Sequence, residues 1–365
     1  MLPRATNHAA RLLRAILLAA IAFASPYASA QRNVLRMFNW NNYMTEESVS
    51  EFEKSCDCRL AQDYYADNEE MLAKLAAGAT GYDLLVPTGN AVEALIKSGQ
   101  LRPLDHAQIP DLDNIKPQFL NNWFDPENHY SVPYAYSLTI IGYNVEKMRS
   151  LGLPTDTWAV IFEPKYLEKV AGKVTVLDSQ RELFAAALIY LGYPANETDE
   201  TRLKEARDLI LRAKPYWAAF NAASYFKELT VGNIWLAHGY SNDFFTAEQD
   251  AKKAHRSFTI GYSTPKEGAV FALDNLVMQK SGTRPDLAYK FIRFWLEGPA
   301  SADLTNTIGA GSPNRRAMAL IDPKIAANPY IFPDAESFKR LQQLRDYDRK
   351  SRRLLNRLWV EVKVR

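Results

Sequence analysis

The chain has 365 residues, of which 47% are hydrophobic and 12% aromatic, and its 44 Lys and Arg against 42 Asp and Glu give a formal net charge of +2. Nucleic-acid-binding proteins normally carry a strong basic excess, so this charge balance argues against a nucleic-acid partner. The length and the apolar content are sufficient for one large domain or for two lobes, with aromatic side chains to spare for a binding surface.

Residues 1–30 have the three-part pattern of a secretory signal peptide. Three arginines without an acidic residue are followed by the apolar run Ala15–Ala24 and by the small side chains of Ala28-Ser29-Ala30. A membrane anchor is the alternative, but the run is shorter than the roughly 20 residues that cross a bilayer. We therefore expect cleavage after Ala30 and export to the periplasm. Loss of the three arginines changes the formal net charge from +2 to −1.

Cys56 and Cys58 are the only cysteines of the chain. In an oxidising compartment they could form a disulfide, although so short a loop is strained; the alternative is two small residues near a strand. Two thiols one residue apart do not make a zinc site without nearby His. No hydrolase, zinc-protease or nucleotide-binding motif is present. We expect no metal, no cofactor and no catalysis, although the residues of a catalytic triad need not be close in sequence.

The N-terminal part of the exported chain alternates between β-rich runs and segments of helical periodicity. The predicted elements are strands at 34–40, 59–65 and 82–86 and helices that begin near Thr45, Asn68 and Ala91. Thr45 and Asn68 are the expected N-caps of the first two helices. Short alternating units of this kind are typical of an α/β fold with a largely parallel sheet.

The remaining chain repeats this mixture. The predicted strands are 131–144, 173–177, 258–262 and 270–278, and the predicted helices are 181–191, 201–213, 285–296 and one in the C-terminal part. The run 131–144 is long enough to pass from one lobe to another, and 270–278 could carry the chain back. Two crossings between α/β lobes imply a cleft, and ligands of such sheets bind beyond the carboxyl ends of the strands.

The sequence predicts two discontinuous lobes. We expect residues 31–136 plus 266–310 to form the first lobe and 137–265 plus 311–365 to form the second. Trp40, Thr88 and Ser179 lie at or just past the ends of predicted strands. They are therefore expected to face the cleft between the lobes.

Several short segments, in order over residues 33–340, resemble the spermidine/putrescine-binding periplasmic proteins. They are Asn39-Trp40-Asn41-Asn42-Tyr43, Tyr82-Asp83-Leu84-Leu85-Val86-Pro87, Tyr130-Ser131-Val132-Pro133-Tyr134, Arg181-Glu182, Ile308-Gly309 with Ser312-Pro313-Asn314, and Phe332-Pro333-Asp334-Ala335-Glu336. The resemblance implies a two-lobed, type II-like periplasmic-binding-protein fold with the ligand cleft between the lobes. It also implies a protein that closes around a polyamine by a hinge motion and delivers it to an ABC permease. For the oligomeric state we expect a monomer.

A polyamine site needs carboxylates for the ammonium groups and aromatic faces along the methylene chain. The resemblance assigns ligand contacts to the corresponding positions of this chain, which are Trp40, Asn41, Asn42, Tyr43, Thr88, Ser179, Glu182, Tyr240, Asp243 and Asp274. Asp274 matches the principal ammonium-binding aspartate of the family, and Glu182 and Asp243 match its other acidic contacts.

Five of these assignments have a structural alternative. Trp40 could belong to the core. Ser179 and Glu182 also fit a capping box, with Ser as N-cap and Glu reaching back to it. Asp243 could cap a helix. Asp274 lies in an apolar run, where a carboxylate is costly to bury without a cationic partner, and an arginine could serve in place of a ligand.

The chain departs from the pattern of the resemblance at four positions. Asn42 and Ser179 replace acidic residues, and Ala272 and Ala310 replace aromatic rings. The missing rings predict a larger pocket, so a bulkier basic solute is an alternative ligand. A sensory protein that binds the same ligand and signals to a receptor is an alternative function.

Residues 339–365 contain ten Lys and Arg against three acids. Leu341, Leu344, Tyr347, Leu355 and Leu358 recur near helical spacing, which predicts an amphipathic helix docked on a lobe. Its basic face could be solvated, or it could contact a permease or anionic lipid.

Overall fold

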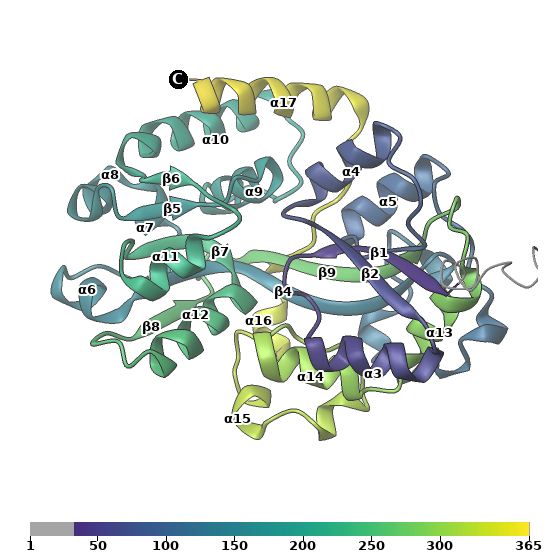
Figure 1. The fold of residues 1–365 in the computed structure, drawn as a ribbon. Helices are drawn as coiled ribbons and strands as arrows, with labels where there is room; N and C mark the ends of the chain where they lie inside the picture. Colours follow the sequence, from purple (N-terminus) through teal and green to yellow (C-terminus); the bar gives the residue numbers. More distant parts are fainter. Residues whose placement is uncertain (1–32, 365) are drawn as a thin grey trace, which may run out of the picture.

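The computed structural model describes residues 33–364, so the predicted signal peptide lies outside the described part of the chain. The fold is α/β, with one mixed sheet of ten strands and helices on both of its faces (Figure 1). The strand order is β2-β1-β3-β9-β4-β7-β5-β6, with β10 beside β9 and β8 beside β4. Among residues 33–364, no helix is long and apolar enough to cross a membrane.

The strands are β1 (Val34–Trp40), β2 (Arg59–Tyr65), β3 (Leu84–Leu85), β4 (Ser131–Asn144), β5 (Val174–Val176), β6 (Ala219–Phe220), β7 (Leu236–Tyr240), β8 (Ile260–Ser263), β9 (Ala269–Met278) and β10 (Leu341–Gln342). The longer helices are α3 (Glu46–Cys56), α4 (Asn68–Ala76), α5 (Gly89–Lys97), α9 (Gln180–Tyr190), α10 (Glu200–Ala213), α11 (Tyr225–Val231), α12 (Ser241–Lys253), α13 (Pro285–Leu296), α14 (Pro299–Ile308) and α17 (Arg349–Val364). The shorter helices are α6 (Val145–Ser150), α7 (Ala159–Phe162), α8 (Pro164–Leu167), α15 (Pro323–Ala326) and α16 (Ala335–Phe338).

The sheet has two parallel flanks, which we call the β1–β3 half and the β5–β7 half. β1 pairs in parallel with β2 and β3, and β5 pairs in parallel with β6 and β7, as the alternating elements predict. The centre is antiparallel, because β4 carries the chain across and β9 carries it back. The expectation of a largely parallel sheet is therefore correct only for the flanks.

The crossing strands β4 and β9 form the connection between the halves. β4 pairs with β9 from Ser131 to Thr139 and then with β7 and β8 as far as Asn144. The pairing with β9 is irregular between Pro133 and Ala135, where a bulge disturbs the register. A bulge bends the strand locally and increases its twist.

Polar side chains fix where the helices of the site begin. Thr45 is the N-cap of α3 and accepts from the Ser48 amide. Asp67, and not Asn68 as expected, is the N-cap of α4. Ser179 is the N-cap of α9. An N-cap satisfies an amide of the first turn and typically stabilises the helix by about 1 kcal/mol.

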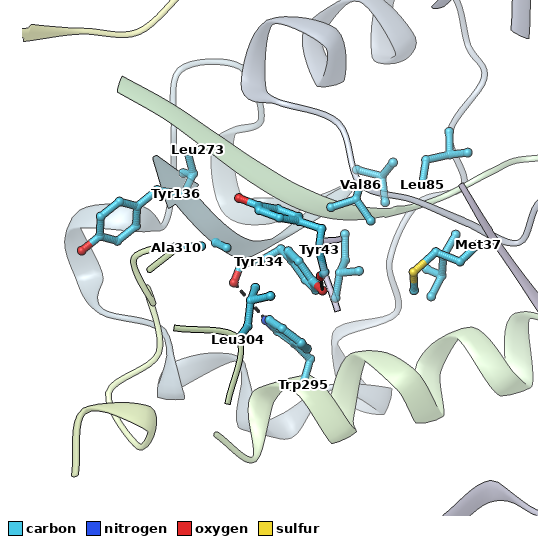
Figure 2. Packing of buried hydrophobic residues seen from close by; sticks show 14 of the residues in the cluster. Met37, Tyr43, Leu85, Val86, Tyr134, Tyr136, Leu273, Trp295, Leu304 and Ala310 are labelled. Atoms are coloured by element: carbon cyan, nitrogen blue, oxygen red, sulfur yellow. Dashed lines mark hydrogen bonds between the residues drawn. The ribbon is translucent and has the colours of Figure 1, made fainter. Parts of the chain in front are cut away.

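The apolar core consists of two large clusters. The first surrounds β1, β3, β4 and β9 and extends to α11 and α12, and the second surrounds β5, α9, α10 and α17. Figure 2 shows part of the first cluster, in which the rings of Tyr134 and Trp295 stack at 3.8 Å and Trp295 Nε1 donates to the Tyr134 carbonyl at 3.0 Å. Tyr134 OH in turn donates to the Tyr43 carbonyl at 2.6 Å. The loop after β1 is thus anchored on crossing strand β4.

The C-terminal helix is shorter than expected. Residues 339–348, which we call the C-terminal strap, are not helical, and α17 begins only at Arg349. Leu341 and Gln342 of the strap pair with β9, and the Asp348 carboxylate accepts from the Ser351 amide at the start of the helix. Helical spacing was misleading because the strap has buried residues in an extended conformation. As predicted, α17 docks on one part of the molecule, because Leu355 and Leu358 lie in the second cluster, around β5, α9 and α10.

Cys56 and Cys58 form a disulfide at the end of α3. Asp57 between them has a φ of 50° and closes the helix in the left-handed conformation. The pairing that the sequence left open is therefore present.

Candidate ligand-binding site

A cavity that is partly open to solvent lies between the two halves, beyond the carboxyl ends of the parallel strands. Nine of the ten predicted contact residues line it; they are Trp40, Asn41, Asn42, Tyr43, Thr88, Glu182, Tyr240, Asp243 and Asp274. They come from the β1–β3 half, from crossing strand β9 and from the β5–β7 half. The cavity is therefore formed by both halves together.

Asp274 lies on β9 and is only 4% exposed. Thr88 Oγ1 donates to its Oδ1 at 2.7 Å, and Tyr43 OH donates to its Oδ2 at 2.8 Å. Burial raises the pKa of the Asp274 carboxyl to about 7, although the two hydroxyl donors act in the opposite direction. Two neutral donors orient this carboxylate without neutralising its charge.

Glu182 lies in the first turn of α9 and is 8% exposed. Its Oε2 accepts from Thr139 Oγ1 of β4 at 2.7 Å. Burial raises the pKa of the Glu182 carboxyl to about 7, against the lowering effects of Thr139 and Arg181. Half of the predicted capping box forms: the Glu182 amide donates to Ser179 Oγ at 3.5 Å, whereas the Glu182 carboxylate is bound by Thr139.

Asp243 is half-buried in the first turn of α12. Tyr225 OH donates to its Oδ2 at 2.6 Å, and burial raises the pKa of its carboxyl to about 6. The helix has its N-cap at Tyr240, without a side-chain capping bond. The alternative role of Asp243 as an N-cap is therefore not observed.

Aromatic rings cover the β1–β3 side of the cavity. Trp40 is half-buried, and its Nε1 donates to the Val86 carbonyl at 2.8 Å. Its ring contacts that of Tyr65, with centroids 4.7 Å apart, and Tyr65 OH also donates to the Val86 carbonyl. The indole is thus held in place while part of its surface faces the cavity. An aromatic face in this position can accept an ammonium group or a methylene chain.

None of the residues that line the cavity is a Lys, Arg or His. Among the described residues, no ion pair involves Asp274, Glu182 or Asp243. The arginine that could have neutralised Asp274 is therefore not in contact with it. Residues 33–364 also contain no group of three or more acidic, His or Cys side chains arranged for a metal ion.

Ser179 is the one predicted contact that does not line this cavity. Its side chain caps α9 and lies at a neighbouring hollow between α4, α5 and the C-terminal strap. Asn42 is exposed, with a φ of 56°. Ala272 lines the cavity, whereas Ala310 is fully buried in the first core cluster (Figure 2). Of the two positions where the resemblance leads us to expect a ring, only Ala272 therefore leaves additional space in the cavity.

The structure adds lining residues that sequence reasoning missed. They are Tyr65, Ala66, Asn68, Ser137, Ala222, Ala223, Phe226 and Asn242. Tyr65 had a usable signal, because it ends the second parallel strand and lies in register with Trp40. Ala222, Ala223 and Phe226 follow strand β6, which is only two residues long and had no recognisable pattern.

Comparison with known proteins decides the family. The profile of the family described as bacterial extracellular solute-binding protein matches residues 47–333. The putrescine/cadaverine-binding protein of Pseudomonas aeruginosa is 49% identical to this chain over 354 residues, which cover 97% of the chain and 100% of the relative. The chain belongs to the bacterial extracellular solute-binding proteins.

Two further relatives of this solute-binding protein agree with that assignment. The putrescine-binding periplasmic protein PotF of Escherichia coli is 32% identical, over 92% of each chain. The crystal structure of the spermidine/putrescine ABC transporter substrate-binding protein PotD from Streptococcus pneumoniae superimposes with a TM-score of 0.75 at 26% identity, over 91% of this chain and 98% of that one. The predicted two-lobed α/β fold and the predicted solute-binding function are confirmed.

Proposed function

We propose that this solute-binding protein binds a short linear diamine of the putrescine or cadaverine type, without transforming it. The supporting observation is the set of three carboxylates, from Asp274 on one side and Glu182 and Asp243 on the other, in a cavity whose lining has no cation. Burying such charges unpaired is costly, so a ligand with two ammonium groups supplies what the protein lacks. The name of the relative at 49% identity indicates the same ligand class.

The carboxylates divide the cavity into two ends. Asp274 is held by Thr88 and Tyr43, next to the ring of Trp40, and is assigned one ammonium group. Glu182 and Asp243 are assigned the other. Ala272 provides the space for a bulkier basic solute, such as a guanidinium-bearing amine, and this is the second candidate ligand.

We further propose that the protein is a periplasmic monomer that delivers its ligand to an ABC permease after hinge closure. The connections through β4 and β9 allow the two halves to rotate about a common axis. The exact lobe boundaries remain a prediction. Ile331 packs in the first cluster and α17 in the second, which favours a boundary within the C-terminal strap rather than at residue 310.

Isothermal titration calorimetry on ligand-stripped protein tests the proposal. The titrants are putrescine, cadaverine, spermidine and agmatine, with butylamine as the control that has one ammonium group. One-to-one binding of putrescine or cadaverine, and at least tenfold weaker binding of butylamine, is expected. Tighter binding of agmatine would favour the bulkier solute. Failure of all four polycations to bind would refute the ligand class and leave the solute-binding fold unaffected.

A further inference from the structure

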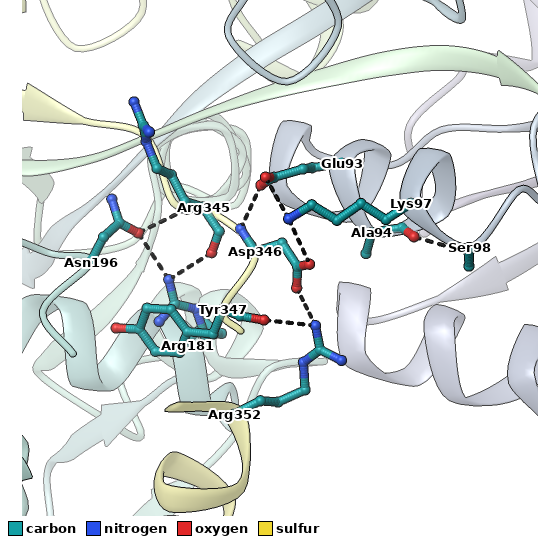
Figure 3. Close-up of polar contacts among 10 residues, drawn as sticks. All are labelled: Glu93, Ala94, Lys97, Ser98, Arg181, Asn196, Arg345, Asp346, Tyr347 and Arg352. Atoms are coloured by element: carbon teal, nitrogen blue, oxygen red, sulfur yellow. Dashed lines mark hydrogen bonds and ion pairs between the residues drawn. The ribbon is translucent and has the colours of Figure 1, made fainter. Parts of the chain in front are cut away.

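The C-terminal strap connects the two halves at a place that does not touch the ligand cavity. It is the third segment, after β4 and β9, that passes between them. Figure 3 shows its residues Arg345–Tyr347 between α5 of the β1–β3 half and the start of α9 of the β5–β7 half. These three residues contact both halves through polar groups, so the strap does more than connect α16 to α17.

One set of contacts fixes the strap to the β5–β7 half. Arg181 of α9 donates to the Arg345 carbonyl at 3.2 Å and to Asn196 Oδ1 at 3.0 Å. The Arg345 amide donates to the same Asn196 oxygen at 2.8 Å. The guanidinium of Arg181 lies 3.7 Å from the ring centroid of Tyr347, whose hydroxyl donates to the Glu197 carbonyl at 2.7 Å.

A second set of contacts reaches α5 in the opposite half. The Asp346 amide donates to Glu93 Oε2 at 2.9 Å, and Lys97 donates to the Asp346 carboxylate at 3.4 Å. Arg352 of α17 donates to the other oxygen of that carboxylate at 2.6 Å. The Asp346 side chain is only 12% exposed, so it is less screened than an ordinary surface charge. One carboxylate thus joins α5 to α17 across the gap between the halves.

These contacts form in an arrangement in which both halves line one cavity. Asp274 and Glu182 reach the same cavity from different sides of the molecule and are 4% and 8% exposed. Rotation of one half away from the other would separate α5 from the strap. The contacts of Asp346 with Glu93 and Lys97 would then be lost, while those of Arg181 and Tyr347 would move together with the β5–β7 half.

We propose that Asp346 is an inter-lobe latch, which stabilises the closed form through Lys97 and Glu93 and thereby slows ligand release without contacting the ligand. Arg181 supports the latch as a positioning residue. It holds the strap against the first turn of α9, in which the next residue, Glu182, faces the cavity. The latch thus adds to the retention of the ligand that the carboxylates of the cavity provide. This inference rests on the proposed closure around a diamine.

The test compares Asp346→Asn, Lys97→Met and the double variant with the unmodified protein. Release of putrescine is followed by stopped-flow tryptophan fluorescence. We expect the dissociation rate constant to rise about fivefold in each single variant, with little change in the association rate constant, because one partly exposed ion pair contributes up to about 1 kcal/mol. The double variant should release putrescine no faster than the faster single variant, because both changes remove the Lys97–Asp346 ion pair between the halves. The other ion pairs that they remove, Arg352–Asp346 and Lys97–Glu93, each lie within one half.

Glu361→Gln is the matched control. Glu361 forms an ion pair with Arg207 at 2.7 Å, which anchors α17 on α10 within one half and bridges no gap. Its release rate should stay within twofold of the unmodified protein. Unchanged release in both Asp346→Asn and Lys97→Met would overturn the latch, as would an equal acceleration in Glu361→Gln.

Hydrogen–deuterium exchange on the ligand-free protein tests the Asp346 contacts without a ligand. Peptides that cover residues 343–348 and α5 should exchange faster in Asp346→Asn, whereas peptides from α10 should not. If putrescine fails to bind the unmodified protein but Asp346→Asn still exchanges faster in these peptides, the proposed ligand is wrong and the contact between Asp346 and Lys97 is supported. If putrescine binds and the exchange is unchanged, the latch is wrong and the proposed function stands.

Discussion

Thr88 Oγ1 donates to Asp274 Oδ1 at 2.7 Å, and through this bond the loop after β3 fixes a carboxylate on crossing strand β9. The two residues also form an isolated antiparallel bridge through their backbones. The position of the charge is therefore set before a ligand arrives, by groups that do not neutralise it. A preorganised carboxylate loses little conformational entropy on binding a cation.

Asp274→Asn keeps the shape of the side chain and removes its charge. We expect diamine affinity to fall by about 30-fold or more, because truncating one partner of a buried ion pair typically costs about 2–5 kcal/mol. Titration calorimetry with putrescine measures this loss. Asp286→Asn, which removes an exposed carboxylate paired with Arg284, is the control and should bind normally. Retained affinity in Asp274→Asn would disprove the assignment of Asp274.

The same substitution should stabilise the ligand-free protein at neutral pH. The folded pKa of Asp274 is about 7, well above that of an unfolded aspartate, so between about pH 4 and 7 the folded state binds more protons than the unfolded state. The contribution of Asp274 to the free energy of unfolding therefore falls as the pH rises through this window. Thermal unfolding at pH 5 and pH 8 should show a larger gain for Asp274→Asn at pH 8.

Diamine binding should weaken as the solution is acidified. The carboxyl pKa values of Asp274, Glu182 and Asp243 in the empty cavity are about 7, about 7 and about 6, whereas the ligand stays fully protonated. Binding favours the ionised carboxylates, so affinity should be highest near pH 8 and fall progressively towards pH 5. Calorimetry at pH 6.5 in buffers of different ionisation enthalpy should show proton release. An affinity independent of pH across this range would contradict the proposed charge pairing.

Trp40→Leu should weaken diamine binding by about two- to thirtyfold, because a cation–π contact contributes about 0.5–2 kcal/mol. Trp40→Phe retains an aromatic face but loses the bond from Nε1 to the Val86 carbonyl, so an intermediate loss is expected. Equilibrium dialysis with radiolabelled putrescine measures both. Equal affinity of Trp40→Leu and the unmodified protein would place Trp40 in the core alone.

His238 predicts a separate acid sensitivity of the fold. It is fully buried on β7, its Nδ1 accepts from the Leu177 amide, and burial lowers its pKa to about 3. Between pH 3 and 6.5 the unfolded state therefore binds more protons, and the free energy of unfolding falls as the pH decreases, by up to about 1.4 kcal/mol per unit.

His238→Asn removes this titration while keeping an acceptor for the amide. Its urea-unfolding free energy should decline less between pH 6.5 and 4 than that of the unmodified protein. His255→Asn, at an exposed position, is the control and should follow the unmodified protein. Parallel pH curves for all three proteins would contradict the assigned role of His238.

Sequence reasoning succeeded where the signal was local or carried by a motif. The strand Ser131–Asn144 and the caps Thr45 and Ser179 are present as predicted, because β-rich composition and capping chemistry act within a few residues. It failed at the strap, where Leu341 pairs with Ala269 of β9. Periodicity carries no information about so distant a partner, so the apolar spacing was interpreted as helix.

The candidate site was also predicted only in part from the sequence. The resemblance supplied the carboxylates, whereas the missed Tyr65 is positioned by its register with Trp40. Ser179 is displaced from the cavity because its hydroxyl accepts from the first turn of α9. Which side of a helix end a small hydroxyl faces depends on packing and cannot be deduced from a motif.

The bulge of β4 between Pro133 and Ala135 lies directly beside Asp274 in the pairing with β9. In the proposed binding mode, an ammonium group at Asp274 therefore lies close to the proposed pivot of closure rather than at the rim of the molecule. Near a pivot the lever arm is short, so a displacement of a fraction of an ångström at the carboxylate corresponds to a much larger movement at the outer edges. A small ligand can in this way change the outline that the whole molecule presents to its surroundings.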